Sequence, residues 1–528
     1  MPPFVGACFL ALSLPCTLFL ALCLTGGVTL GAVPTLYDEV LYPNAPFAQT
    51  HPDRLATLAI LFGMDPAPIH RCRVLELGCG DGSNLIPMAF ENPAAQFLGL
   101  DVAAVAIRAG NQEIATLGLA NIRLEHRDIL DAGPALGTFD YVIAHGLYSW
   151  VPEPVRDKLL ALAQAVLAPH GVAFISYNAL PGGRVRQIFR DMMLFHLGTV
   201  TDFEARIHGA REVVQWFQAC QPSEEPSAIF QSQVDSIMQR PPRVLYHDEL
   251  GAVYHPVYFQ EFAAHAARFG LQFLAEANYH DMQPGRLPAA VVAQIDRVAA
   301  ANRIVRDQYF DFMKCRMFRQ TLLCHQTIVL PDAPLAARLP LLCAASAAKP
   351  VTAKPDLTAG VAEEFRGGQG TGVTTAHPLT KAVMLLLREA WPQTLCIPDL
   401  LAAASRLAGE QPGPEGLAPI ILATYSAGVI ELHAQPPHCV ARVSQFPTAS
   451  QLARSQARRG RLMTTTRHTT VEVADEKVRT LIGLLDGTRD FAALVRELRP
   501  VLQLPEDVLV KGIQANLTLL AEMGVLVA

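Results

Sequence analysis

The stretch VLELGCGDGSN, residues 74–84, decides how the first half of this chain folds. A short apolar run at 73–77 is typical of a buried parallel strand, and an apolar-periodic segment resumes at Leu85, so the glycines lie in a strand-to-helix turn. Such turns, at the carboxyl edge of a parallel sheet, are where α/β folds bind nucleotides. Side chains at Gly78 or Gly80 would hold the backbone away from a ligand. The stretch therefore predicts a parallel α/β sheet with a nucleotide site at this turn.

The spacing of the glycines indicates which nucleotide binds. A dinucleotide fingerprint needs G-x-G-x-x-G, but here the third glycine comes one residue early, at Gly82, and Ser83 occupies the required position. Glu76 would also stand close to a bound pyrophosphate and repel it, whereas it would favour a cation. S-adenosylmethionine (SAM) carries a sulfonium and an ammonium and no phosphate. The alternative is a glycine-rich loop without a ligand.

Polar residues follow the next strands in the expected order. The predicted strand 96–100 ends at Asp101, where a carboxylate can accept both ribose hydroxyls, and the strand 122–125 leads to Asp128, a candidate for the adenine amino group. A fourth strand at 139–144 and a fifth at 172–177 complete the series. The predicted cofactor residues are Glu76, Gly78, Cys79, Gly80, Gly82, Asn84, Asp101, Val102, Asp128, Ile129 and His145, and no metal is required.

At this point a family resemblance is clear, because residues 37–178 resemble the class I SAM-dependent methyltransferases. Four segments, YDEV at 37–40, QTHPDRL at 49–55, AHGLYSWVP at 144–152 and FRQTLLCH at 318–325, resemble bacterial methyltransferases with a "methyltransferase regulatory domain". That group includes protein-lysine methyltransferases acting on outer-membrane proteins. The resemblance implies a Rossmann-like sheet with a helical regulatory insertion, and a C-terminal α+β winged-helix-like domain.

With 528 residues the chain is too long for one hydrophobic core. A helix at 256–269, a glycine and a strand at 271–274 resemble the element that adds a sixth strand to such sheets, and 287–325 is predicted to form one or two long helices. The composition of 344–376 is typical of a linker. The predicted division is an apolar N-terminal extension (1–33), a SAM-binding core (34–200), a regulatory region completing the sheet (201–330), a linker (331–376) and a winged-helix-like domain (377–528).

The N-terminus carries no charged residue from Phe4 to Val33, a run long enough to cross a bilayer. A secretory signal would carry Lys or Arg, and the first here is Arg54. Because the family-like sequence begins near Leu36, we expect an overextended translation start and a cytoplasmic protein. The alternative is a membrane anchor through residues 4–33.

Charge and cysteine content limit the classes of partner. A formal net charge of −6 argues against an obligate nucleic-acid binder, although arginines between 442 and 467 form a local basic stretch. We prefer the reading in which these arginines contact carboxylates of a docked protein. The eleven cysteines include no C-x-x-C pair, which indicates reduced thiols and no zinc site. An apolar stripe from Tyr309 to Phe318 is predicted to be core or a homodimer surface.

The expected reaction is methyl transfer to an acceptor, for which a protein lysine amine is the first candidate. A lysine must lose its proton first, and bringing a pKa of about 10.4 to neutral pH costs roughly 4 to 5 kcal/mol unless the site lowers it. The predicted catalytic residues are His145 or Tyr148, which can orient or deprotonate the amine, and Tyr148 and Trp150, which can flank it. The alternatives are a small-molecule or natural-product acceptor, and a non-catalytic SAM-binding regulator whose C-terminal domain binds a partner or DNA.

Overall fold

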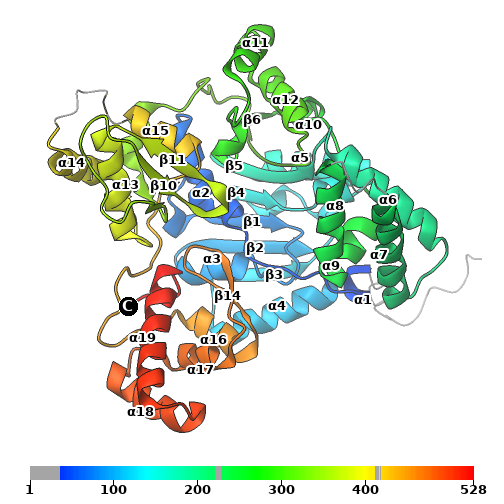
Figure 1. Ribbon diagram of the computed structural model, residues 1–528. Helices are drawn as coiled ribbons and strands as arrows, with labels where there is room; N and C mark the ends of the chain where they lie inside the picture. Colours follow the sequence, from blue (N-terminus) through cyan, green and yellow to red (C-terminus); the bar gives the residue numbers. More distant parts are fainter. Residues whose placement is uncertain (1–35, 221–227, 411–415, 417) are drawn as a thin grey trace, which may run out of the picture.

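The computed structural model describes residues 36–220, 228–410, 416 and 418–528 (Figure 1). The predicted N-terminal extension, and with it the choice between a misassigned start and a membrane anchor, lies outside these residues. Within the described ranges no helix is both long enough and apolar enough to cross a membrane, and no group of histidines, cysteines and carboxylates is arranged to hold a metal.

A seven-stranded mixed sheet lies at the centre of the molecule, in the order β3-β2-β1-β4-β5-β7-β6. The first five strands are parallel, and β7 inserts antiparallel between β5 and β6. Because parallel strands end at the same edge, the residues that follow β1, β2, β3 and β4 come together there. The strands are β1 (Arg73–Leu77), β2 (Gln96–Asp101), β3 (Ile122–His126), β4 (Phe139–Ala144), β5 (Leu167–Asn178), β6 (Leu271–Glu276) and β7 (Phe318–His325). The predicted α/β fold is confirmed.

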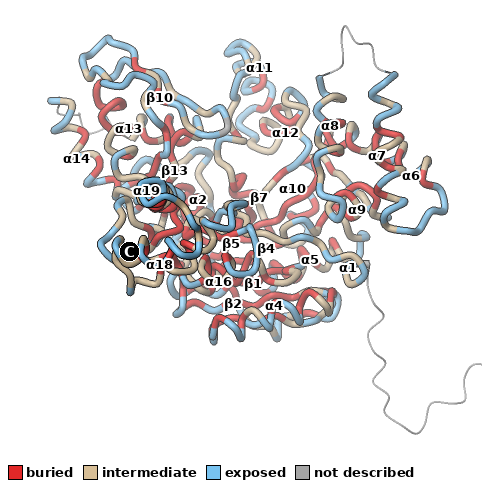
Figure 2. Tube along the Cα trace, turned by 60° about the horizontal axis from the view of Figure 1, so that its bottom comes forward, coloured by how far each residue is buried: buried red, intermediate tan, exposed pale blue. Residues whose placement is uncertain are grey.

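Alternating residues of these strands face two separate cores. Val74, Ile143 and Phe174 pack with α2 (Pro52–Leu61), α3 (Leu85–Glu91) and α4 (Ala104–Leu117), whereas Leu75 and Val142 pack with α5 (Glu153–Val166) and α10 (Phe259–Arg268). Figure 2 shows that the strands are buried along most of their length. Because of this alternation, only some of the predicted site residues lie on the same face of the sheet as Glu76.

The prediction of one or two long helices at 287–325 is wrong in its last part. The segment divides into α11 (Ala289–Ala299) and α12 (Arg303–Lys314), and the chain then turns at Cys315, which has a left-handed φ of 48°, into β7. Residues 321–324 are all buried, and a buried run this short shows neither the helical nor the strand spacing of apolar residues. The sequence pattern therefore does not distinguish a strand from a helix here.

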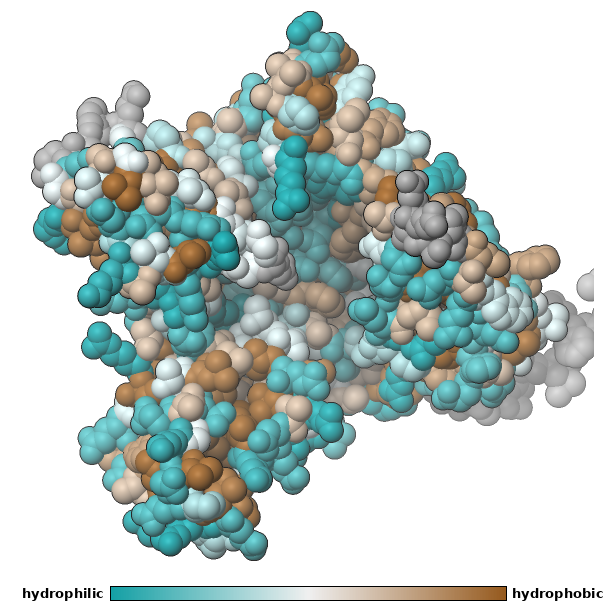
Figure 3. All heavy atoms as spheres, in the orientation of Figure 1, coloured by the Kyte–Doolittle hydropathy of each residue, from teal (hydrophilic) through white to brown (hydrophobic). Residues whose placement is uncertain are grey.

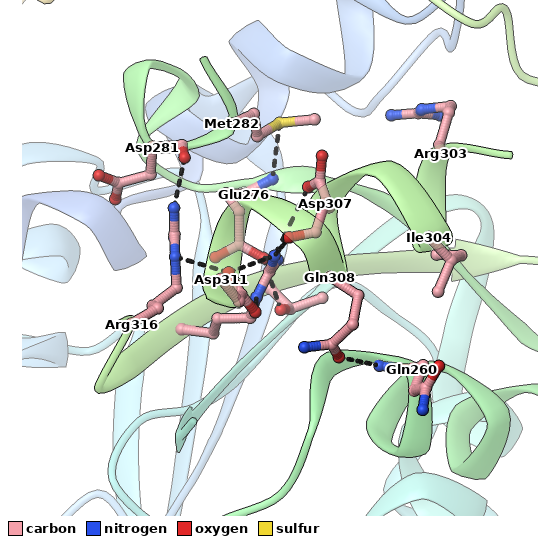
Figure 4. Close-up of polar contacts among 12 residues, drawn as sticks. Gln260, Glu276, Asp281, Met282, Arg303, Ile304, Asp307, Gln308, Asp311 and Arg316 are labelled. Atoms are coloured by element: carbon pink, nitrogen blue, oxygen red, sulfur yellow. Dashed lines mark hydrogen bonds and ion pairs between the residues drawn. The ribbon is translucent and has the colours of Figure 1, made fainter. Parts of the chain in front are cut away.

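A buried charge network holds β7 in this place (Figure 4). Arg319 is 1% exposed, and its guanidinium bonds to Asp311 at 2.8 and 3.0 Å and to Glu276 at 2.7 Å. Glu276 also accepts from the Thr321 hydroxyl, and Arg316 pairs with Asp311 at 2.9 Å. The network ties β6, β7 and α12 together, so the regulatory region is part of the catalytic sheet.

Four helices form a lobe of their own beside the sheet (Figure 1). They share a core around Phe189 and Val214. The helices are α6 (Gly183–Leu197), α7 (Phe203–Ala219), α8 (Ala228–Gln239) and α9 (Pro242–Leu250).

The segment 331–376, predicted to be a linker, is structured. It contains β8 (Cys343–Ala345), β9 (Lys349–Pro350), β10 (Glu363–Arg366) and β11 (Gly372–Thr375), and β8 is the middle strand between β12 (Leu395–Cys396) and β13 (Glu431–His433). Together with α13 (Pro378–Ala390), α14 (Ile397–Ala408) and α15 (Ala418–Ser426), these strands pack on α2 in the first core. We call residues 343–433 the middle unit. Composition gave no sign of β8 in particular, because both of its partner strands, β12 and β13, lie far along the chain.

The remaining residues form the C-terminal lobe, with a core of its own around Leu481 and Leu517. It contains α16 (Gln451–Arg459), β14 (Leu462–Thr464), β15 (Thr470–Glu472), α17 (Glu476–Leu484), α18 (Phe491–Leu502) and α19 (Glu506–Glu522). Residues 377–528 thus divide between two cores, in contrast to the single domain predicted. The turn between β14 and β15, residues 465–469, is called the wing here.

Candidate functional site: a cofactor turn beneath an N-terminal lid

The glycine turn after β1 has the predicted geometry. Gly78, Gly80 and Gly82 have φ angles of 77°, 55° and 74°, which L-residues with a side chain rarely adopt. Crowding adds a second reason, because a Cβ on Gly80 would lie 2.2 Å from the Asn44 amide nitrogen. The Gly80 N–H donates to Asp101 Oδ2 at 2.7 Å, which joins the turn to the end of β2. Cys79 is buried beside Gly99, and burial raises the pKa of its thiol, so it acts as a packing residue.

Glu76 has the properties expected of a cation ligand. Its side chain is buried, Oε1 accepts from Asn84 Nδ2 at 2.8 Å, and Oε2 has no hydrogen-bond partner among the described residues. Burial, as the largest cause, raises the pKa of Glu76 to about 8. A buried carboxylate oxygen without a partner is costly, and the ammonium or hydroxyl of a ligand would satisfy it. The turn and Glu76 therefore fit SAM.

The residues predicted to hold the ribose and adenine lie along the same edge. Asp101 accepts from the N–H groups of Gly80 and Ala103, and burial raises its pKa. Val102 is 37% exposed beside it. Asp128 is exposed and accepts from the Leu130 N–H at 2.9 Å, while Ile129 is buried. Their contacts with a cofactor remain predictions.

Residues 36–51, here called the lid, run across the glycine turn. Asp38 accepts from the Val105 N–H at the start of α4, and Asn44 Nδ2 donates to Asp81 at 3.1 Å. The Phe47 N–H donates to Asn84 Oδ1 at 3.0 Å, and the Phe47 ring stacks on His145 with centroids 4.0 Å apart. Residues 49–51 belong to a segment that carries the family resemblance, but Asn44 and Phe47 were missed because no local pattern distinguishes them.

His145 lies under this lid at the end of β4. Its ring is stacked between Phe47 and Phe174, and Phe318 approaches edge-on at 6.3 Å. Burial lowers the pKa of His145 to about 4, so the imidazole is neutral at pH 7. These four rings make an aromatic wall next to the cofactor turn.

Tyr148 does not join this wall. It is buried in the core of the opposite face of the sheet, and its hydroxyl lies 2.7 Å from His265 Nδ1, whose other nitrogen lies 2.7 Å from Asp157. The side chain switches face because the chain turns through Gly146 after β4. This position contradicts the prediction that Tyr148 orients or deprotonates an acceptor.

Trp150 lies where the sheet meets the helical lobe. The Arg186 guanidinium lies 5.1 Å from its ring centroid, and Tyr254 packs beside it. Arg186 in turn pairs with the fully buried Glu249 and donates to Asn178 Oδ1 at 2.9 Å. Trp150 is thus part of a junction between β5, α6 and α9, and the three predicted catalytic residues are not brought together.

One residue of the site comes from the far end of the chain. His468 in the wing lies with Nε2 2.9 Å from Asn84 Oδ1, across 384 positions of sequence. Sequence reasoning had no signal for it, since a histidine in a polar turn is unremarkable by itself.

Three family profiles match this chain. They are described as "Methyltransferase domain" at residues 74–171, "Predicted methyltransferase regulatory domain" at 241–325, and "PKMT, C-terminal winged helix domain" at 446–504. These matches agree with the predicted SAM-binding core, regulatory region and winged helix.

Two curated relatives are uncharacterised proteins of Rickettsia prowazekii. One is 40% identical over 55% of this chain and 53% of its own length, so the chain spans about half of that relative. The other is 35% identical over 44% of this chain and 94% of its own length. Among solved structures, PKMT2 from Rickettsia typhi in complex with AdoHcy has a TM-score of 0.83 and 24% identity, and the match covers 92% of this chain and all of that one. That likeness extends the shared fold to the middle unit and the C-terminal lobe.

Proposed function

Because this chain belongs to the SAM-dependent methyltransferases that carry a methyltransferase regulatory domain, we propose that it transfers the methyl group of SAM to a lysine amine of a protein. SAM binding is supported chiefly by Glu76, a buried carboxylate at a glycine turn, one of whose oxygens has no hydrogen-bond partner among the described residues. The protein-lysine half is supported by the PKMT-type winged helix and by a fold shared with PKMT2 over nearly the whole chain.

The chain's own residues hold the cofactor as follows. We assign the cofactor's ammonium to Glu76 and its ribose to Asp101, with the backbone of the glycine turn close to both. Asp128 is assigned to the adenine. When bound, SAM supplies a methyl group on a sulfonium, which an uncharged amine can attack in line. The catalytic work left to the protein is to position that amine and exclude water.

His145 is assigned to lining rather than to proton transfer. An imidazole whose pKa is about 4 is a weak base and cannot efficiently take a proton from an ammonium near pKa 10.4. Three rings of the aromatic wall, those of Phe47, His145 and Phe318, can instead surround the lysine. They lower the pKa of its amine by desolvation and stack on its alkyl chain. The incoming lysine then loses its proton to solvent water as it enters the site.

The surface supports a macromolecular acceptor. Figure 3 shows a broad hollow, lined largely by hydrophilic residues, between the middle unit, the C-terminal lobe and the helical lobe. A small-molecule methyltransferase buries most of its acceptor in an enclosed pocket. The open hollow therefore favours a protein segment, and the small-molecule alternative ranks second.

Methyl transfer from radiolabelled SAM to the proteins of a bacterial lysate tests the proposal. We expect label in discrete protein bands and, by mass spectrometry, in methyl-lysine. A Glu76→Ala variant, shown to be folded by circular dichroism, serves as the control and should transfer none. Label found only in low-molecular-weight products would favour the small-molecule alternative, and no transfer together with no SAM binding would contradict the activity itself.

A further inference from the structure

We propose that the wing of the C-terminal lobe is a working part of the cofactor site, in which His468 positions Asn84 and through it Glu76. The inference rests on the proposed function, because it concerns the same SAM site. It gives the C-terminal lobe a role in cofactor binding. Packing of the wing against Asn84 and binding of the cofactor should each strengthen the other.

Asn84 is the residue on which the contacts converge. Its Nδ2 donates to Glu76 Oε1 at 2.8 Å and to the Thr50 hydroxyl at 3.0 Å, while its Oδ1 accepts from the Phe47 N–H. His468 adds a bond to the same Oδ1. Strand β1, the lid and the wing therefore meet at one buried amide, and rotation of that amide would break bonds to all three.

His468 is suited to hold the amide in one orientation. Because Nδ2 of Asn84 is the donor to Glu76, Oδ1 must accept, so His468 donates from Nε2. The ring is 5% exposed and lies 5.0 Å from the ring of His51. Burial lowers the pKa of His468 well below its usual value, so the ring is neutral at pH 7, and the bond to Asn84 places its one N–H on Nε2.

The backbone of the wing is built to present this ring. His468 has a φ of 55°, a left-handed conformation that is unfavourable for a residue with a side chain. The turn is closed by bonds between Thr465 and Thr469 and tied to the C-terminal lobe by Thr466, whose N–H donates to Gly524. A strained backbone inside a turn held by so many bonds indicates that the contact of His468 with Asn84 has a function.

The neighbouring residue anchors the wing to the middle unit. Arg467 pairs with Glu431, donates to the Pro392 carbonyl at 2.7 Å and lies 4.3 Å above the Trp391 ring. The wing is therefore fixed on one side to the middle unit and on the other to the cofactor turn. A movement of the C-terminal lobe, such as one caused by a bound protein substrate, would reach Asn84 directly.

Calorimetric titration of the full chain with S-adenosylhomocysteine tests the coupling. Loss of one neutral hydrogen bond predicts about fivefold to tenfold weaker binding by His468→Ala. The matched control is Arg459→Ala, which removes a different contact between the C-terminal lobe and the core, the ion pair with Glu113 on α4. This variant should bind S-adenosylhomocysteine within about twofold of wild type. Equal affinity of His468→Ala and wild type would overturn the proposal.

A double-mutant cycle separates positioning from a general loss of packing. If His468 acts through Asn84, then His468→Ala adds little to the loss already caused by Asn84→Ala, whereas independent effects would multiply and contradict the proposal. If wild type itself binds no cofactor, the proposed function fails and not merely the coupling.

Hydrogen exchange provides a readout for the case in which His468→Ala does not fold. Linkage requires that the cofactor stabilise the docked wing as much as the wing stabilises the cofactor. S-adenosylhomocysteine should therefore slow amide exchange at 465–469 in wild type. Unchanged exchange in the wing at saturating ligand would also overturn the coupling.

Discussion

At the scale of single residues, the site depends on two groups whose charge state is set by burial. Glu76 holds its proton up to about pH 8 without a ligand, and His145 stays neutral down to about pH 4. Desolvation is the largest cause of both shifts; for Glu76 the negative charges of Asp101 and Asp81 add to it, while the hydrogen bond from Asn84 opposes it. The first shift makes cofactor binding depend on pH, and the second removes a candidate base.

Cofactor affinity should rise with pH through the pKa of Glu76. Below about pH 8 the carboxyl is protonated and binding of an ammonium must displace that proton, whereas above it the carboxylate is already ionised. We expect the affinity for S-adenosylhomocysteine to increase by roughly 25-fold between pH 6.5 and 8.5, in proportion to the ionised fraction of a carboxyl whose pKa is about 8. Calorimetry across this range measures it. Glu76→Gln serves as the control and should bind weakly with a flat profile; an equal slope in that variant would assign the proton elsewhere.

Replacing His145 distinguishes lining from proton transfer. His145→Phe keeps a ring between Phe47 and Phe174, so we expect kcat within about threefold of wild type, whereas His145→Ala opens the aromatic wall and should lose about tenfold or more. Single-turnover methylation of a peptide acceptor measures both. Equal, near-complete loss in the two variants would restore His145 as a base.

At the scale of elements, buried polar side chains fix strands and helices against one another, and Tyr148, a predicted catalytic residue, is one of them. Tyr148 bonds to His265 on α10, and Arg319 on β7 holds Glu276 on β6 and Asp311 on α12. The Tyr148 bond joins the regulatory region to the catalytic core, and the Arg319 network fixes β7, which pairs with β5 of the core sheet.

Tyr148→Phe should change stability and leave chemistry intact. Removing the hydroxyl leaves His265 without its 2.7 Å partner and is expected to cost about 1 kcal/mol of unfolding free energy. Because the side chain lies on the opposite face from Glu76, kcat should stay near the wild-type value. A loss of more than about tenfold in kcat, with the midpoint of urea denaturation unchanged, would contradict this placement.

Arg319→Ala should be strongly destabilising. It leaves Glu276 and Asp311 buried without their main counter-charge, for which about 3 to 5 kcal/mol is typical. The control is Arg366→Ala, which removes an exposed pair with Glu364 and should leave the free energy of unfolding nearly unchanged. Urea denaturation of both variants measures the difference, and similar midpoints would show that the network contributes little.

At the scale of the whole molecule, the middle unit and the C-terminal lobe extend the catalytic domain. β8 needs both β12 and β13, and the middle unit covers α2 in the first core. Two arginines of the predicted basic stretch, Arg459 and Arg467, pair with Glu113 and Glu431. These two arginines are therefore used within the chain, and both the docking of a partner protein on the rest of the basic stretch and its alternative, DNA binding, stay predictions.

Truncation should reveal this dependence. A chain of residues 34–376 ends before β12 and β13, so it exposes the apolar surface beneath them and is expected to aggregate. A chain of residues 34–445 keeps both strands and should remain monodisperse in size-exclusion chromatography, although it lacks the wing. Cooperative unfolding of 34–376 as a monodisperse species would show that the segment 331–376 is a linker after all.

The sequence by itself determined the parallel sheet, the glycine turn, the cofactor and the positions of Glu76, Asn84 and Asp101. These are encoded locally, since strand, turn and helix follow one another within a few residues and each carries its own pattern. Tertiary structure alone decided that β7 is a strand, that Tyr148 turns away from the site, that 331–376 is folded, and that His468 reaches Asn84. Each of these depends on contacts between residues far apart in the sequence. Such contacts produce no periodic pattern in the residues that make them.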